Sequence, residues 1–326
     1  SIFFERAGKL YPMHDVFADD EQIRVIIDRI ISPLGRRIDE RSPIVNARLP
    51  SGYRVNAVIP PIAIDGPVLT IRKFSDRITS LGELVNLGSL PSWYAQLLSC
   101  AVSLRQDLAV AGGTGSGKTT LLNALSCEID LGERIVTIED SAELKFARHP
   151  HVVRLEARQE SIEGKGEVSI RQLVANALRM RPDRIVVGEV RGEECIDMLQ
   201  AMNTGHSGSL TTLHANSTKE AIGRLVTMVR YSSDVPVEVV ESYIAAAMDV
   251  VVQTVRNIDG TRYVSEISGF YFDEVQRRCR VRTFYERPLP ANKGRWIDVP
   301  DWVDDLALQG HAEEREVSEW KQRISS

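Results

Sequence analysis

This sequence of 326 residues lacks several features that define whole classes of protein. Its cysteines stand far apart and form no C-x-x-C pair, which argues against a disulfide scaffold or a zinc knuckle and favours a reducing cytosol. They are Cys100, Cys127, Cys195 and Cys279. No apolar run approaches the roughly 18 residues that cross a membrane, so we expect no spanning segment. The polar start at Ser1 shows neither a signal peptide nor an initiator Met, as expected for a piece of a longer protein.

An excess of positive charge is also missing. The 40 Lys and Arg residues are outnumbered by 45 Asp and Glu, which gives a net charge of −5. No overall basic field is therefore available for nucleic acid, and a nucleic-acid translocase is disfavoured. The 43% hydrophobic and 26% charged residues are typical of a globular chain and exclude disordered, collagen-like and coiled-coil proteins. The length suits one large domain or two ordinary ones.

The first part of the chain indicates a small mixed domain. Apolar residues at helical spacing predict a helix over Gln22–Ile31, ended by a proline and a glycine. Two partly alternating stretches, Tyr53–Ile59 and Val68–Phe74, predict strands joined by a turn-rich connector. A break rich in Gly and Pro follows. We therefore expect a small α+β domain over residues 1–88 and a second domain over residues 89–326.

The second domain alternates between strand and helix patterns. Short apolar strands are predicted at Leu108–Ala111, Arg134–Ile138, Arg184–Val187 and Ser209–Leu213. Helices are predicted after the first strand, at Ser169–Met180 and at Glu193–Met202. This alternation predicts an α/β fold with a mostly parallel sheet covered on both faces.

After residue 249 the pattern changes again. Val250–Arg256, Tyr263–Ile267 and Arg280–Tyr285 read as strands, with a turn at Asp259-Gly260. Strands joined by such tight turns are antiparallel. We expect them to be added at the edge of the parallel sheet.

The strongest motif is a glycine-rich run that fits G-x-x-x-x-G-K-[ST]. It comprises Gly112, Gly113, Thr114, Gly115, Ser116, Gly117, Lys118 and Thr119, followed by Thr120. Glycines let successive backbone N–H groups point at a phosphate chain, and the next helix adds the positive end of its dipole. Lys118 can reach the β- and γ-phosphates, and the Thr119 hydroxyl can bind magnesium. Because the run follows a predicted strand and opens a predicted helix, it indicates a P-loop NTPase.

Carboxylates follow two of the predicted strands. Glu139 and Asp140 end one strand, and Glu143 comes one turn later. The strand Arg184–Val187 is followed by Gly188-Glu189, so glycine stands where a magnesium aspartate is usual. Carboxylates at the carboxyl ends of such strands can orient and deprotonate water, although capping and surface solvation are the ordinary alternatives. Glu189 is then either the magnesium-side carboxylate or the base itself.

Two further groups are candidates. His206 and His214 flank the strand Ser209–Leu213. A lone histidine is usually structural, but two beside a nucleotide site can sense the γ-phosphate; they lack metal-ligand spacing, and no zinc is expected. Arg54 and Arg72 lie in the two N-terminal strands, where surface solvation is the default. In a ring, either guanidinium can contact the γ-phosphate of a neighbouring subunit.

Four of these segments together resemble the secretion/traffic ATPase superfamily, which includes the motors of type II secretion, type IV pili and type IV secretion. In order they match its Walker A, Asp, Walker B and His boxes: Gly112–Thr120, Arg134–Leu144, Arg181–Gly192 and Gly205–Asn216. Further strings resemble the CpaF/TadA-type ATPase of the tight-adherence (Tad) pilus: Gly35–Glu40, Ala47–Gly52, Arg54–Ile59, Asp65–Phe74 and Asp197–Thr204. The resemblance covers Phe3–Val255. The chain departs from it at Asn46, where an Asp is expected, and has no four-cysteine zinc insertion.

The resemblance implies a RecA-like ATPase domain in a cytoplasmic homo-hexamer that uses ATP and Mg²⁺. The ring would sit at the inner membrane through platform proteins of a pilus or secretion machine. No direct membrane span and no nucleic-acid partner are implied. Rigid-body motions driven by ATP would push pilin subunits. An ATP-gated assembly scaffold with little turnover is the alternative, and Glu189→Gln separates the two.

The same resemblance assigns roles to the candidate residues. Glu139 would polarise water, and Glu189 with Thr119 would lie on the magnesium side. His206 and His214 would form the His-box pair. Arg54 and Arg72 would reach the phosphate from the N-terminal domain.

Overall fold

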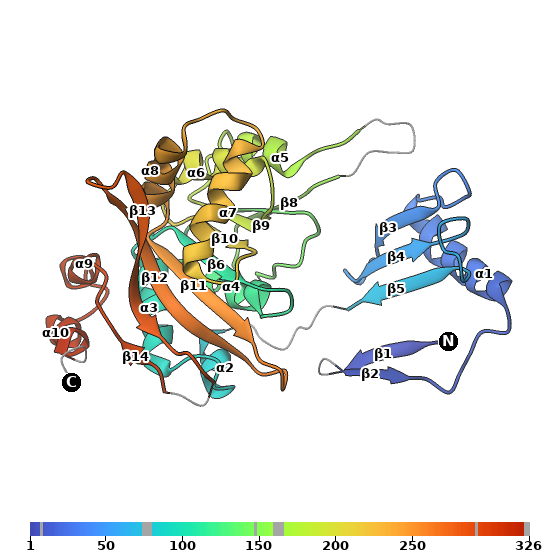
Figure 1. The fold of residues 1–326 in the computed structure, drawn as a ribbon, viewed down its shortest axis with the longest axis horizontal. Coiled ribbons are helices and arrows are strands. Elements are labelled where there is room, and N and C mark those ends of the chain that lie inside the picture. The colour runs from blue at the N-terminus through green and yellow to red at the C-terminus, as the bar shows by residue number, and fades with distance from the viewer. Residues whose placement is uncertain (7–8, 74–79, 147–148, 159–165, 291–292, 323–326) are drawn as a thin grey trace. The chain divides into compact units, whose positions relative to one another are not determined.

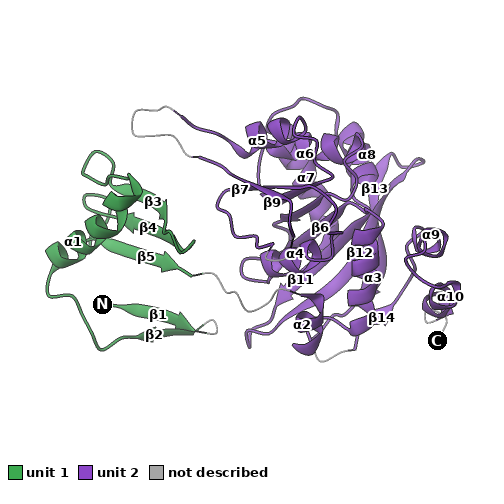
Figure 2. Cartoon of the chain, turned by 180° about the vertical axis from the view of Figure 1, so that it is seen from behind, with its two compact units in different colours: residues 1–76, 160–165 green, residues 77–159, 166–326 purple. Residues whose placement is uncertain are grey.

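The computed structural model describes residues 1–6, 9–73, 80–146, 149–158, 166–290 and 293–322, and the chain forms two compact units. Figure 2 shows residues 1–76 in the first unit and residues 77–159 and 166–326 in the second. This division falls ahead of the boundary expected after residue 88. The reason is α2 (Leu81–Asn86), whose Leu81 and Leu84 are buried in the apolar core of the second unit.

The first unit is built around a three-stranded antiparallel sheet, in the order β3-β4-β5. Its elements are β1 (Phe3–Arg6), β2 (Lys9–Pro12), α1 (Asp20–Ile31), the 3-10 helix η1 (Ser32–Leu34), β3 (Ile44–Arg48), β4 (Arg54–Val58) and β5 (Val68–Arg72). Asp19 caps α1 by accepting a hydrogen bond from the Gln22 N–H at 2.8 Å. Ile27 and Ile31 of α1 then form a small core with one face of the sheet. The expected helix and two strands are present; β3 was not expected, and Phe74 lies outside the described residues.

The second unit contains a mostly parallel sheet, as predicted. Its order among the described residues is β14-β13-β12-β11-β6-β10-β9-β7-β8. The parallel strands are β6 (Leu108–Gly112), β7 (Ile135–Glu139), β8 (Val152–Glu156), β9 (Arg184–Val190), β10 (Leu210–Leu213) and β11 (Val250–Arg256). The antiparallel strands are β12 (Arg262–Asp273), β13 (Arg278–Glu286) and β14 (Arg295–Trp296).

One prediction about this sheet needs correction. Residues 250–256 were expected to belong to the antiparallel edge, but β11 runs parallel to β6, with Val250 opposite Leu108. The chain reaches β11 from β10 through two helices, a crossover that returns it in the same direction. The antiparallel part therefore begins only at β12.

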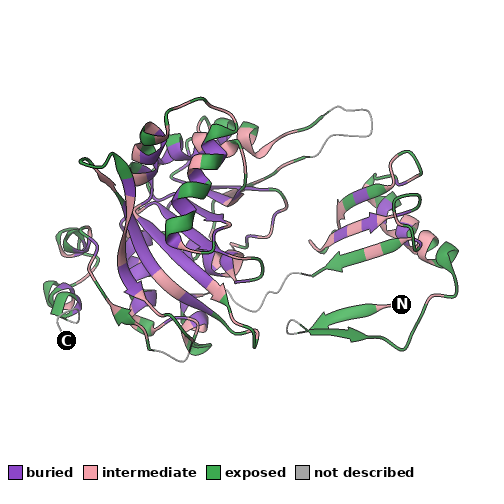
Figure 3. Cartoon of the chain, viewed as in Figure 1, coloured by how far each residue is buried: buried purple, intermediate pink, exposed green. Residues whose placement is uncertain are grey.

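Helices cover both faces of this sheet (Figures 1 and 3). One face packs against α5 (Ile170–Ala177), α6 (Glu194–Asn203), α7 (Thr218–Arg230) and α8 (Val237–Ala247), and the other against α2, α3 (Ser92–Ser103) and α4 (Lys118–Ser126). The terminal helices α9 (Val303–Leu308) and α10 (Glu314–Gln322) pack on α3. Within the part of the chain that is described, no helix combines the length and apolar character needed to cross a bilayer.

Polar groups are buried at the amino-terminal edge of the parallel strands. The Arg184 side chain is inaccessible to solvent, and its Nε donates to Glu133 Oε2 at 2.7 Å. Its Nη2 donates to Glu133 Oε1 at 3.0 Å and to the Val102 carbonyl at 2.7 Å, and its Nη1 donates to the Gly208 carbonyl at 3.1 Å. These bonds satisfy a charge that would otherwise be costly to bury. The Arg184 guanidinium therefore joins three segments of the chain at this edge of the sheet.

Asp107 beside this network makes the stability of the second unit depend on pH. Its carboxylate accepts a hydrogen bond from the Ser209 N–H at 2.8 Å, and burial raises its pKa to about 8. The folded protein therefore keeps a proton that the unfolded chain releases near the ordinary aspartate pKa of about 3.9. The stability that this proton contributes is fully present below pH 4 and is lost as the pH rises to about 8. Over that range the free energy of unfolding falls by at most about 1.4 kcal/mol per pH unit.

We expect Asp107→Asn to flatten this pH dependence, because the amide keeps the acceptor oxygen but does not titrate. Urea unfolding between pH 5 and pH 8, followed by tryptophan fluorescence, measures it. All four tryptophans lie in the second unit: Trp93, Trp296, Trp302 and Trp320. The nearby Asp249, whose pKa burial also raises, remains in both proteins. Equal slopes for the wild type and the variant would contradict the assignment.

Candidate nucleotide site

The glycine-rich run forms a loop between β6 and α4, as predicted (Figure 1). Gly115 and Gly117 have φ values of 70° and 101°, a left-handed conformation that glycine adopts without strain. Gly112 is required for another reason, since a Cβ there would lie 2.4 Å from Ser116 Oγ. The loop is thus a tight turn whose shape only glycines allow.

Lys118 begins α4 and turns its ammonium back over this loop. Only 8% of the residue is exposed. Its Nζ donates to the Gly112 and Gly113 carbonyls, at 3.1 Å each, and lies 3.3 Å from His214 Nε2. Burial lowers the pKa of the Lys118 ammonium. The pKa of His214 is also lowered, first by burial and further by the nearby charge of Lys118. A cation is therefore held where a phosphate chain would enter the loop.

Glu139 ends β7 and is almost fully buried. Its Oε1 accepts hydrogen bonds from the N–H groups of Glu143 at 2.8 Å and Leu144 at 2.9 Å, while its Oε2 has no hydrogen-bond partner among the described residues. Burial raises its pKa to about 6. The group is ionised at neutral pH but is close enough to neutrality to exchange a proton.

The structure explains why glycine stands at position 188. β7 and β9 are neighbours, with Ile138 opposite Val187. A Cβ at residue 188 would lie 2.9 Å from Cγ of Glu139. An aspartate there would therefore displace Glu139. The absence of the usual aspartate is thus coupled to the presence of this buried glutamate.

Glu189 connects the acidic and basic groups of the site. Its Oε2 accepts hydrogen bonds from Nε of Arg191 at 2.8 Å and from Nη2 of the same guanidinium. Arg191 Nη1 also donates to Asp140 Oδ2 at 3.2 Å. On its other side Glu189 Oε1 lies 3.0 Å from His214 Nε2. Glu189 Oε1 has no hydrogen-bond partner within the described residues, so a neutral His214 can use Nε2 to accept from Lys118 while it lies beside the carboxylate.

These groups meet because β6, β7, β9 and β10 are parallel neighbours. Their carboxyl ends lie on one edge of the sheet, the usual place for a ligand in this fold. The structure therefore brings Lys118, Glu139, Glu189 and His214 to a single edge.

His206 is not brought there. It precedes β10, whereas His214 follows it, and the four residues of that strand span about 13 Å. The His206 carbonyl accepts from Ser209 Oγ at 2.8 Å, at the opposite edge of the sheet. The expectation that both histidines act at one phosphate site is therefore not met within a single chain.

Arg54 and Arg72 belong to the first unit, where the strand register places them opposite each other. Arg48 on β3 is opposite Arg54, so the three arginines form one row across the sheet. Alternation puts this row on the face away from α1, since Val45, Ala47, Ala57 and Leu69 belong to the core under that helix. The row concentrates three guanidinium groups on this face of the sheet. The row is suited to binding an anion.

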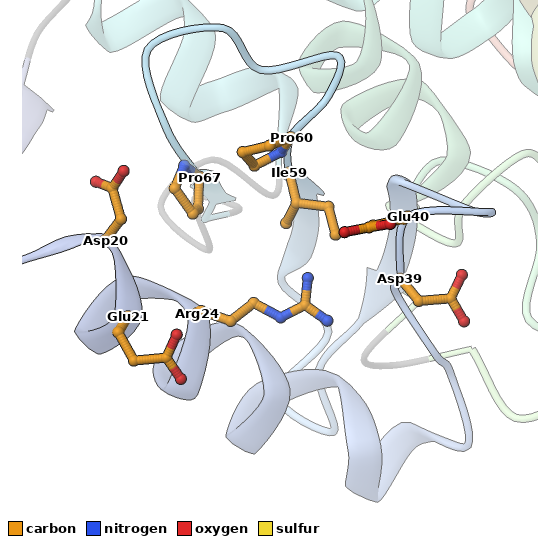
Figure 4. Close-up of a pocket in the computed structure, with 8 residues that line it drawn as sticks. All are labelled: Asp20, Glu21, Arg24, Asp39, Glu40, Ile59, Pro60 and Pro67. Atoms are coloured by element: carbon orange, nitrogen blue, oxygen red, sulfur yellow. The ribbon is translucent and has the colours of Figure 1, made fainter.

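The first unit also contains a hollow of about 380 Å³, seen in Figure 4. Its charged lining consists of four carboxylates and Arg24, whose guanidinium already donates to Asp28 and to the Ile38 carbonyl. The other residues are Asp20, Glu21, Asp39, Glu40, Ile59, Pro60 and Pro67. This net negative lining makes the hollow unsuitable for phosphate.

Sequence reasoning missed several residues of the site. Arg191 follows Glu189 by two positions, one residue past the end of β9, and this spacing places side chains on one side of an extended chain. That signal was available. Arg256 and Arg262 flank the turn at Asp259-Gly260, but only the pairing of β11 with β6 brings them to the loop. Within the described ranges, no group of three or more His, Cys, Asp or Glu residues is arranged to hold a metal by itself.

Comparison with known proteins identifies the family. A model of the type II/IV secretion system protein family matches residues 1–284. A Mycobacterium tuberculosis protein named for conjugal transfer is 42% identical over 258 residues, 77% of this chain and 73% of the relative. The conjugal transfer protein TrbB of Rhizobium radiobacter is 33% identical over 285 residues, 84% and 83% of the two chains. The type IV secretion system protein VirB11 of Brucella suis is 35% identical over 274 residues, 74% of each.

Solved structures agree on the fold. The Legionella pneumophila ATPase DotB gives a TM-score of 0.58 at 24% identity, covering 97% of this chain and 88% of DotB. The pilus retraction motor PilT gives 0.57 at 22% identity, covering 79% and 73%. The chain has the phosphate loop, the two acidic strand ends and the imidazole, and the family model matches most of its length. It therefore belongs to the type II/IV secretion system protein family.

Proposed function

We propose that this protein is a Mg²⁺-dependent ATPase that works as a homo-hexameric motor of a pilus or secretion machine. The observation that carries the proposal is the edge of the sheet where Lys118 Nζ lies 3.3 Å from His214 Nε2, which lies 3.0 Å from Glu189 Oε1. A cation that binds phosphate and a carboxylate that can act on water or metal there lie beside the same imidazole. Hydrolysis of a phosphoanhydride needs these groups together.

The residues at this edge fit ATP and magnesium. The loop glycines leave room for a phosphate chain, and the N–H groups at the start of α4 face its charge. The Thr119 hydroxyl and the Glu189 carboxylate are hard oxygen donors, the kind that magnesium prefers. Bound Mg²⁺ would neutralise charge on the phosphates. Lys118 would bind the β- and γ-phosphates, while Glu139 or Glu189 would orient the attacking water and take its proton.

The arginine row of the first unit supplies the remaining part of the proposal. Arg54 and Arg72 would contact the γ-phosphate held by a neighbouring subunit. An arginine supplied by another subunit stabilises negative charge as the phosphoryl group transfers. Such shared sites would couple hydrolysis to rigid-body motion around a ring.

The finer assignment follows the motifs of the N-terminal domain. Strings such as Gly35–Glu40 and Asp65–Phe74 resemble the Tad-pilus ATPases, so we assign the motor to that type of machine. It would act in the cytoplasm, held at the inner membrane by platform proteins. The relatives named for conjugal transfer and type IV secretion are compatible with a role in moving macromolecules.

The proposal is tested by the ATP hydrolysis rate per subunit as protein concentration is raised through the assembly range. We expect the rate to rise with concentration, and to fall about 10³-fold or more in Arg54→Ala and Arg72→Ala, the size of an arginine-finger effect. Arg29→Ala is the matched control, because Arg29 is an exposed arginine of the same unit on α1. It should hydrolyse ATP like the wild type.

Other outcomes would contradict the proposal in distinct ways. A constant non-zero rate would refute shared sites and leave a self-contained ATPase. A zero rate at every concentration, with ATP binding intact, would refute the motor and favour a nucleotide-gated scaffold.

A further inference from the structure

The side of the phosphate loop away from Glu189 is occupied by the hairpin of β11 and β12. In the sheet order, β10 and β9 lie on one side of β6 and β11 lies on the other. Thr254 of β11 contacts the loop directly, since its Oγ1 is 2.9 Å from Ser116 Oγ and donates to the Ala111 carbonyl at 3.1 Å. The hairpin is thus part of the wall of the nucleotide site.

Two arginines of this hairpin face the loop. Arg256 and Arg262 are directly opposite each other across β11 and β12. Arg262 Nε donates to the Gly115 carbonyl at 2.7 Å, and its Cδ lies 3.4 Å from the position of a Cβ at Gly117. Arg256 Nη1 lies 3.2 Å from the position of a Cβ at Gly115. Both guanidinium groups therefore reach the loop that would hold the phosphates.

The partners of the two arginines differ. Arg262 is fixed by the loop carbonyl. Arg256 is exposed and has neither an ion pair nor a hydrogen bond within the described part of the chain. Two cations at paired positions repel each other, and a third cation, Lys118, lies over the phosphate loop itself. Asp259 in the hairpin turn accepts hydrogen bonds from the N–H and the hydroxyl of Thr261 and forms no ion pair with either arginine within the described residues. An anion that binds beside the arginines would therefore stabilise this positive charge.

We infer that Arg256 is a direct ligand of the nucleotide's α-phosphate. The inference rests on the proposed ATP site and adds a residue to it. Glu189 and His214, on the β9–β10 side, mark the end where the γ-phosphate is cleaved. The phosphate chain therefore extends toward the hairpin, and its α-phosphate lies at the end where Arg256 has its free guanidinium. Arg256 thus binds the α-phosphate from within the same subunit, at the end of the phosphate chain that Lys118 does not contact.

The test is calorimetric binding of two ligands, a non-hydrolysable ATP analogue and inorganic triphosphate, to the full chain. Arg256→Ala should weaken both by about 10- to 100-fold, the size of one charged hydrogen bond. Arg256→Lys should recover part of the loss, because it restores the charge without the planar fork. Arg230→Ala, which removes an exposed arginine from the last turn of α7, should bind both ligands like the wild type.

Each result bears on a different statement. Affinities of Arg256→Ala within twofold of the wild type, with Lys118→Ala still defective, would overturn the inference and leave the nucleotide site standing. A loss confined to the ATP analogue would also overturn it, since the contact would then be to the base or ribose. Failure of the wild type to bind either ligand would overturn the proposed function itself.

Discussion

The Glu189→Gln variant is expected to bind ATP as tightly as the wild-type protein but to hydrolyse it about 10²–10⁴-fold more slowly. Glutamine keeps the size of the side chain and removes its charge. It can neither accept a proton from water nor support a metal, and it cannot pair with Arg191 as a carboxylate does at 2.8 Å. Binding is retained because Lys118 and the loop N–H groups are unchanged. Steady-state hydrolysis and calorimetric ATP binding on the same preparation measure the two parts.

Glu193→Gln is the matched control for this experiment. Glu193 is another carboxylate after β9, but it pairs with Arg171 at 3.3 Å instead of facing the loop. Its variant should hydrolyse ATP at the wild-type rate. Full activity in Glu189→Gln would remove Glu189 from the chemistry and leave Glu139 as the only acid of the pair. Loss of ATP binding in Glu189→Gln would mean that the carboxylate supports the loop instead of the reaction.

Arg184→Met should lower the free energy of unfolding of the second unit by about 3–5 kcal/mol. The methionine fills part of the space but leaves the Glu133 carboxylate without the two bonds that Arg184 supplies, at 2.7 and 3.0 Å. Arg105 Nη2, 3.1 Å from the same carboxylate, is half-exposed and compensates only in part. The Val102 and Gly208 carbonyls also lose their donors. Urea unfolding followed by tryptophan fluorescence measures the loss in this unit alone.

A second substitution makes this prediction specific. Glu133→Gln in the Arg184→Met background removes the stranded charge, so the double variant should be more stable than Arg184→Met. A double variant that is less stable by the sum of the single effects would show that the two residues act independently. An Arg184→Met midpoint equal to that of the wild type would contradict the buried pair.

Much of the candidate site is readable from short stretches of sequence. The phosphate loop follows from the spacing of Gly112, Gly117 and Lys118, and its context follows from the apolar strand before it. Glu139 and Glu189 were identified because each stands at the end of a short apolar run, and parallel strands end at one edge of a sheet. Arg191 was equally accessible, two residues beyond Glu189. In all these cases the determining interactions are local or follow from the regular geometry of one strand.

The remaining features depend on which strands become neighbours. His206 and His214 are eight residues apart in sequence, yet they lie at opposite edges of the sheet because β10 runs between them. Leu81 and Leu84 belong to the second unit because they are buried in its apolar core. β11 runs parallel beside β6, and that pairing alone sets Arg256 against the phosphate loop. The sequence by itself determined the loop, its lysine and the two acidic strand ends. The tertiary structure decided which cations and imidazoles reach them, because strand pairing is made by contacts between distant residues that no local pattern records.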